Sequence, residues 1–242
     1  MSALGQDARP VDPHGQRYIT TMEEFLERKG NLPTGQAIYA LVRQAAPQRY
    51  KDNPDLDMGL KMIAYQLAIN GFSPSDLNAL KKQGLDLAEI AITESQIGSP
   101  PVQSAAVTPL VVIAKVVGYE ETLEPGDGYR STLFFEVKEV LRGEVSSQRI
   151  ALRRRSGAEV YNSADIPNRI GAEYLLFLSN ELYRYMARFP DQFSGKVREN
   201  IPEEELARYY EMNGGFLPMA YVTEEDIEQI REVDRLIKSV LR

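Results

Sequence analysis

Three arginines at alternating positions of one short segment are the residues whose type and spacing best suit a binding chemistry. Arg149, Arg153 and Arg155 lie in the segment RIALRRR, residues 149–155. Side chains alternate between the two faces of a β-strand, so these three should share one face and Arg154 should point to the other. Guanidinium groups in a row bind phosphates or carboxylates through paired hydrogen bonds. We therefore take Arg149, Arg153 and Arg155 as the candidate ligand- or partner-binding residues.

The same arginines have a simpler interpretation, which is pairing within the chain. Glu136, Glu139 and the acidic segments after residue 202 could neutralise the row and keep an exposed strand soluble. The composition favours this alternative, because the net charge is −7 and acidic residues outnumber basic ones in both halves. Broad binding to a phosphate backbone then lacks electrostatic support, and nucleic acid is a disfavoured partner.

The sequence contains few residues that could bind a metal ion or a cofactor. The chain has no cysteine, and its single histidine, His14, lies in a polar segment rich in Pro and Gly. Asp52, Asp55 and Asp57 cluster before a predicted helix, but they lack the spacing of a calcium loop, and helix capping accounts for Asp55. The sequence predicts no metal site and no cofactor.

Carboxylates are the remaining residues that could catalyse a reaction. Glu203–Glu205 and Glu224–Asp226 could supply a pair for hydrolysis. Both groups fall in the predicted first turn of a helix, where acidic residues complement the helix dipole in any case. No glycine-rich phosphate loop or nucleophile motif accompanies them. We therefore expect no catalytic residues.

Four strand-like runs must position the arginines. They are residues 110–120, 131–143, 149–155 and 170–179, and a fifth is expected at 182–189. Tyr174, Leu176 and Leu178 should face one way along the fourth run, and Ile150 and Leu152 should point inward from the third. A slip in the alternation around Val140 indicates a β-bulge. These patterns predict a five-stranded antiparallel β-barrel.

The rest of the chain reads as helical, which makes the fold α+β. We expect a flexible tail over residues 1–17, a small helical N-terminal region over 18–97 and a linker over 98–109. The prolines at 100 and 101 favour an extended spacer there. The barrel and a C-terminal helical segment then fill residues 110–242. One helix is expected to start at Pro202 and stop at residues 213–215, and another to run from Thr223 to Leu241.

The barrel segment resembles a bacterial β-barrel family with the oligonucleotide-binding (OB) topology of the netrin and tissue-inhibitor-like (TIMP-like) superfamily. The resemblance covers residues 110–179 and rests on VVIAKVVGYE, FEVKEVLRGEV, RIALRRRSG and IGAEYLLFLS. It implies an OB-like barrel in which the step from Glu139 to Gly143 ends the second strand. The cysteines of the animal inhibitors are absent, so metalloprotease inhibition is not implied. Bacterial relatives are typically exported to the cell envelope, although the visible N-terminus lacks a secretory signal.

Taken together, the patterns favour a non-enzymatic binding or interaction module with a protein partner. The first alternative is nucleic-acid binding through the face that carries Arg149, Arg153 and Arg155. The second is a carboxylate-dependent hydrolase. No apolar run reaches the length of about 20 residues that a membrane-spanning helix needs. The specific partner and the oligomeric state are left open by the sequence.

Overall fold

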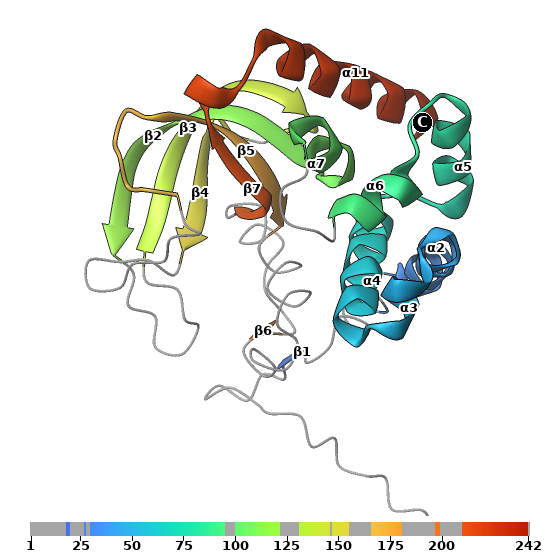
Figure 1. The fold of residues 1–242 in the computed structure, drawn as a ribbon. Coiled ribbons are helices and arrows are strands. Elements are labelled where there is room, and N and C mark those ends of the chain that lie inside the picture. The colour runs from blue at the N-terminus through green and yellow to red at the C-terminus, as the bar shows by residue number, and fades with distance from the viewer. Residues whose placement is uncertain are drawn as a thin grey trace, which may run out of the picture.

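The computed structural model describes residues 18–19, 27, 30–94, 100–121, 131–145, 147–154, 166–180, 197–198 and 210–241. The predicted tail at 1–17, the predicted strand at 182–189 and the start of the predicted helix at Pro202 lie outside the described residues. β1 (Tyr18–Ile19) pairs antiparallel with β6 (Val197–Arg198) as a short ribbon. The remaining described elements form a group of helices beside a five-stranded sheet (Figure 1).

Helices succeed one another between residues 32 and 107. They are α2 (Leu32–Ala45), α3 (Gln48–Asp52), α4 (Pro54–Ile69), α5 (Pro74–Lys82), α6 (Leu87–Glu94) and α7 (Pro101–Val107). Side-chain caps set three of the starts, among them that of α6, where Asp86 accepts from the amides of Ala88 and Glu89. The Asn53 side chain accepts hydrogen bonds from the first amides of α4, so the cap is Asn53 and not the expected Asp55. Ser73 and Asp76 form a capping box at the start of α5.

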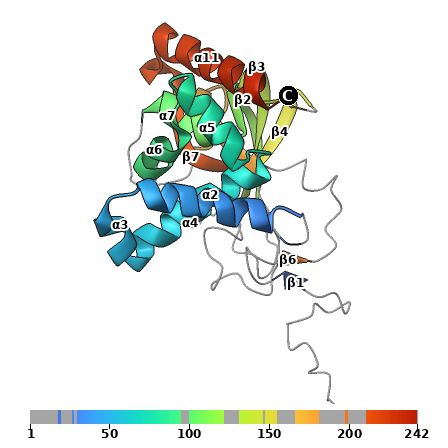
Figure 2. The ribbon, with the colours of Figure 1, turned by 90° about the vertical axis from the view of Figure 1, so that its right-hand side faces the viewer.

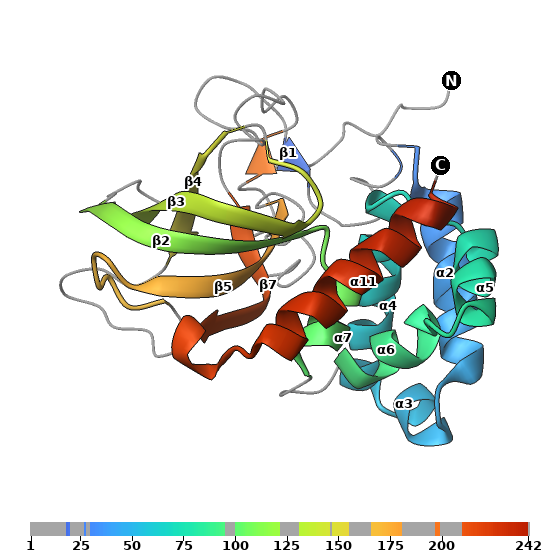
Figure 3. The ribbon, with the colours of Figure 1, turned by 90° about the horizontal axis from the view of Figure 1, so that it is seen from above.

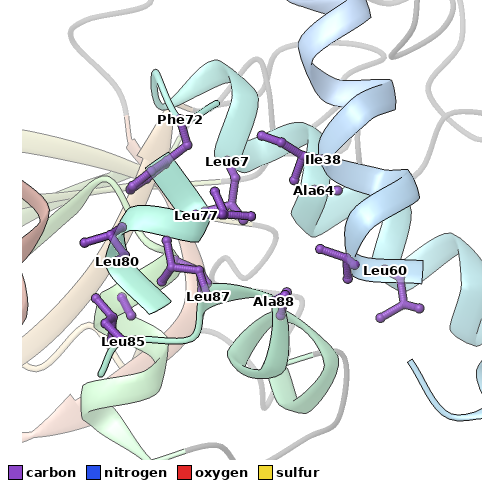
Figure 4. Close-up of a cluster of buried hydrophobic side chains, with 14 of the residues drawn as sticks. Ile38, Leu60, Ala64, Leu67, Phe72, Leu77, Leu80, Leu85, Leu87 and Ala88 are labelled. Carbon is purple, nitrogen blue, oxygen red and sulfur yellow. The ribbon is translucent and has the colours of Figure 1, made fainter. Parts of the chain in front are cut away.

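These helices share one apolar core. Figure 4 shows the side chains of α2, α4, α5 and α6 pointing toward one another. Each fully buried leucine contributes about 1.5–3 kcal/mol relative to an exposed one, so this core stabilises the helical region. Its most deeply buried members include Ile38, Leu60, Leu67, Leu80 and Leu87.

The sheet contains β2 (Leu110–Glu121), β3 (Ser131–Arg142), β4 (Arg149–Arg154), β5 (Glu173–Asn180) and β7 (Tyr210–Pro218). The order is β4-β3-β2-β5-β7, and every neighbouring pair is antiparallel. The fold is therefore α+β, as the sequence predicts. Among the described residues no pairing joins the outer strands β4 and β7, so the structure shows a five-stranded antiparallel sheet and does not confirm its closure into a barrel.

Both faces of the central strand β2 are buried, as its apolar run predicts. Val112 and Val116 face an inner core together with Leu176 of β5. Val111 and Ile113 face the opposite side, where helices cover the sheet. Two other predicted alternations are confirmed: Tyr174, Leu176 and Leu178 share the inner core, as do Ile150 and Leu152.

The predicted bulge in the second strand is also present. Along the β2–β3 pair the register skips Leu141 and again Lys138, which are extra residues on β3. Val117 is the corresponding extra residue on β2. Bulges bend strands and strengthen their twist, so this pair is curved.

The fifth strand of the sheet differs from the expectation. It is β7, in a segment where the sequence predicted the end of a helix with residues 213–215 as its stop. Between Phe216, which pairs with Leu176, and Met212, which pairs with Leu178, β7 has two more residues than β5. Gly215 within this insertion has a φ of +110°. The glycines thus mark an irregularity within a strand, which is another place where glycine often occurs besides a helix end.

The segment predicted as an extended linker contains a helix. In α7, Ser104, Ala105, Ala106 and Val107 are all buried. Pro101 begins this helix at a position where the missing amide costs nothing, so the proline pair starts a helix here. Because α7 packs against both α6 and α11, residues 101–107 belong to the folded core.

The C-terminal helix joins the two halves of the molecule. α11 (Glu224–Val240) begins with the predicted capping box of Thr223 and Asp226. Ile230 packs in the cluster that covers the sheet, whereas Val233 and Ile237 pack in the core of the helical region. Figure 3 shows α11 running diagonally from the strands to the helices, and Figure 2 shows the helices standing in front of the sheet.

Candidate functional site

The structure places the side chain of one of the three candidate arginines. Arg149 is exposed at the start of the outer strand β4. Arg154 shares the inner face with Ile150 and Leu152, and it is buried, with its Nε donating to Ser131 Oγ (2.8 Å) and its guanidinium to the Ile166 carbonyl (2.8 Å). The Arg153 side chain and all of Arg155 lie outside the described residues. Arg149 is therefore the member of the row that the structure places.

Arg149 ends a row of alternating charges across four strands. The register pairs Glu173 of β5 with Lys115 of β2, Lys115 with Glu136 of β3, and Glu136 with Arg149. Lys138 also donates to Glu136 (2.7 Å). A hydrogen bond from Lys138 lowers the pKa of the Glu136 carboxyl, and the charges of Lys115 and Arg149 lower it further. This arrangement agrees with the interpretation that Arg149 is neutralised within the chain.

We expect Arg149→Gln to have little effect on folding. An exposed ion pair contributes only about 0–1 kcal/mol, so the urea midpoint should barely move. The pKa of Glu136 should rise toward its ordinary value, which titration monitored by NMR would detect. Wild type should show no salt-dependent affinity for single-stranded DNA at low salt. Micromolar binding that disappears in the variant would favour the nucleic-acid alternative instead.

Aspartates just before α4 and in its first turn have structural roles. Asp57 accepts hydrogen bonds from Tyr39 (2.7 Å) and from Arg43 Nε (2.9 Å), which joins α2 to α4. Burial, together with the bond to Asp57, raises the pKa of Tyr39 to about 12. Asp52 accepts from Gln48. Within the described ranges, no three Asp, Glu, His or Cys side chains come close enough together to hold a metal ion.

The acidic start of α11 also has an ordinary explanation. Asp226 accepts hydrogen bonds from the amide (2.9 Å) and the hydroxyl of Thr223. These bonds lower the pKa of Asp226, so it is an ionised capping group and not a proton donor at neutral pH. Glu224 and Glu225 are exposed beside it. The other acidic candidates, residues 203–205, lie outside the described residues, as does His14.

A buried ion pair that sequence reasoning missed connects the sheet to the helices. Arg142, at the end of β3, is only 5% exposed and donates to the carbonyl of Thr108 (2.6 Å) just after α7. Its guanidinium lies 3.8 Å from Asp234 Oδ1 on α11. Burial lowers the pKa of Arg142 to about 10, and Asp234 acts in the opposite direction. The other oxygen of Asp234 pairs with Lys238 (2.7 Å).

Glycine makes this junction possible. Gly143 follows Arg142 with a φ of +78°, and its amide donates to Asp234 (3.3 Å). A Cβ atom at this position would lie 2.3 Å from the carbonyl oxygen of Pro109, so only glycine fits. The segment from Glu139 to Gly143 thus connects β3 both to the residues that follow α7 and to α11, because Glu139 also pairs with Arg231 of α11. We call Arg142, Gly143 and Asp234 the α11 junction, which is a structural site.

An exposed surface remains at the far end of β2. β2 pairs with β5 as far as Lys115, and two further backbone hydrogen bonds join Val116 to Ala172 and to Gly171. We call the last four residues, 118–121, the β2 overhang. They pair with β3, and no backbone hydrogen bond joins their other edge to any described residue.

Three exposed apolar or aromatic side chains lie on this overhang or next to it. Val117 is 36% exposed and Tyr119 is 43% exposed. Ile170, which is 64% exposed, sits in the turn from Arg169 to Ala172 that is hydrogen-bonded to Val116. An open strand edge beside exposed apolar side chains is a surface on which another extended chain can pair.

Comparisons of the sequence with known proteins suggest no function, so the function has to be inferred from the geometry of the structure. The sequence matches no protein-family model and no curated protein. No helix in the described part of the chain is both long and apolar enough to span a membrane.

Proposed function

We propose that the protein is a non-enzymatic interaction module that binds an extended segment of a partner protein along the β2 overhang. The observation that carries the proposal is the open edge of residues 118–121, beside the exposed side chains of Val117, Tyr119 and Ile170. Main-chain hydrogen bonds to such an edge provide affinity, and the side chains that flank it select the sequence.

The proposal includes a finer view of the fold. We infer that the sheet curls toward an OB-like barrel of the netrin and tissue-inhibitor type. Its support is that the outer strands β4 and β7 come into contact although they do not pair, and that the bulges in β2 and β3 provide the curvature that a barrel needs. In such a barrel the overhang is an edge that closure does not cover.

The described residues give the two alternatives less support. Arg149 stands opposite Glu136 in the register, and its charge acts on that carboxyl, so one cation of the proposed nucleic-acid row is partly neutralised. For hydrolysis, Asp226 is held as a helix cap with a lowered pKa, whereas a catalytic acid needs a raised one. Neither observation is what a nucleic-acid-binding face or a catalytic acid would be expected to show.

The test is amide hydrogen exchange with short extended peptides as probes. Capped peptides that alternate valine with threonine, lysine or glutamate would be titrated into the full-length protein. We expect at least one probe to slow exchange within residues 118–121, at alternate positions, because backbone groups of a strand point outward every second residue. Exchange in α11 should not change.

Substitution of Tyr119 provides the matched comparison. Tyr119→Ala should weaken the probe by about 1–2 kcal/mol, the range for an exposed aromatic residue at the centre of an interface. Tyr221, which is 76% exposed in the 3-10 turn η1 (Met219–Tyr221), is the control, and Tyr221→Ala should leave affinity unchanged. If no probe protects the overhang, or if both variants lose affinity equally, the proposal is wrong.

A further inference from the structure

The β2 overhang ends in two carboxylates that the chain does not neutralise. Glu120 and Glu121 are both exposed. In the register they stand opposite Thr132 and Ser131 of β3, and within the described part of the chain neither has an ion-pair partner. Two glutamates of the neighbouring strand differ, because Glu136 pairs with Lys138 and Glu139 with Arg231. The edge that no described residue pairs with thus ends in two adjacent exposed carboxylates.

These charges argue against a second copy of the chain as the occupant. Two identical overhangs paired antiparallel along residues 118–121 would place Glu121 of one copy diagonally across from Glu120 of the other, on the same face of the sheet. Long side chains of like charge repel each other at this diagonal position, and charged residues on an edge are a common defence against self-association. The net charge of −7 on each copy adds to the repulsion.

Resting on the proposed function, we propose that the partner segment is an extended basic peptide. Lysine or arginine side chains would stand opposite Glu120 and Glu121, and an apolar residue would contact Val117 and Tyr119. Arg169 is an exposed cation in the neighbouring turn, but within the described part of the chain it forms no ion pair with either glutamate. Charge complementarity therefore selects basic strands, while the backbone edge requires that they be extended.

The experiment compares the three probes on charge variants of the full chain. The double variant Glu120→Gln/Glu121→Gln removes the two carboxylates. The control, Glu224→Gln/Glu225→Gln, removes the same charge from exposed glutamates at the start of α11. Because each exposed ion pair contributes little, we expect the first variant to weaken the lysine probe about three- to tenfold and the control to leave it unchanged.

The outcomes separate this inference from the proposed function. Support requires that the lysine probe bind most tightly, that its affinity fall as salt rises, and that the glutamate probe bind least. Equal binding of all three probes, with no effect of the double variant, overturns the basic partner but leaves strand addition intact. Failure of every probe to protect residues 118–121 overturns both.

Discussion

Asp234→Ala should lower the free energy of unfolding by about 3–5 kcal/mol, the usual cost of removing one partner from a buried ion pair. Arg142 would keep its hydrogen bond to Thr108 but would lose the only anion that faces it among the described residues. Gly143 would lose the acceptor of its amide as well. Urea unfolding followed by circular dichroism measures the change.

Lys238→Ala is the matched control, because it removes the exposed partner of the same carboxylate. The Lys238 side chain is 56% exposed, so its loss should cost no more than about 1 kcal/mol. The double variant Arg142→Met/Asp234→Leu should recover most of the stability, since an apolar pair leaves no charge buried. Equal losses in Asp234→Ala and Lys238→Ala would mean that Arg142 does not depend on Asp234.

The sequence predicts those parts of the fold that repeat locally. The alternation of Tyr174, Leu176 and Leu178, and the capping box of Thr223 and Asp226, depend on neighbours within a few residues. Both are confirmed. The bulge in β3 was also visible, because an extra residue shifts the alternation within the strand itself.

Elements that depend on distant contacts were missed. α7 has only seven residues, too few to show a helical period, and it forms because its small side chains are buried against α6 and α11. β7 contains glycines that also suit a helix end, and only its pairing with β5 decides between the two. Arg142 and Asp234 lie far apart in sequence, so their types alone could not reveal the pair.

In the candidate site, too, the features set by local alternation were predicted, whereas those set by distant contacts were not. Alternation correctly placed Ile150 and Leu152 inward and Arg149 outward, but it did not show that Arg154 would be buried and satisfied by Ser131. The β2 overhang depends on where β5 stops pairing, which the turn at residues 169–172 determines. No local pattern in β2 reports the length of a strand more than fifty residues later.

Gly143→Ala should be nearly as damaging as the loss of Asp234, for a different reason. The left-handed conformation costs alanine about 1–2 kcal/mol. In addition, the new Cβ would lie 2.3 Å from the Pro109 carbonyl oxygen, which is backbone and cannot rotate away. Crowding of a packed site typically costs a further 1–3 kcal/mol or so, which makes the expected loss about 2–5 kcal/mol in urea unfolding.

Gly84→Ala separates these two contributions. Gly84 has a similar φ of +93°, but a Cβ atom there would meet nothing within 4 Å. It should therefore show only the conformational cost, partly offset because alanine also restricts the unfolded chain. The difference between the two variants measures how closely β3 approaches the segment between α7 and β2. If both variants lose the same stability, the backbone of Pro109 can move aside, and the α11 junction is looser than its geometry indicates.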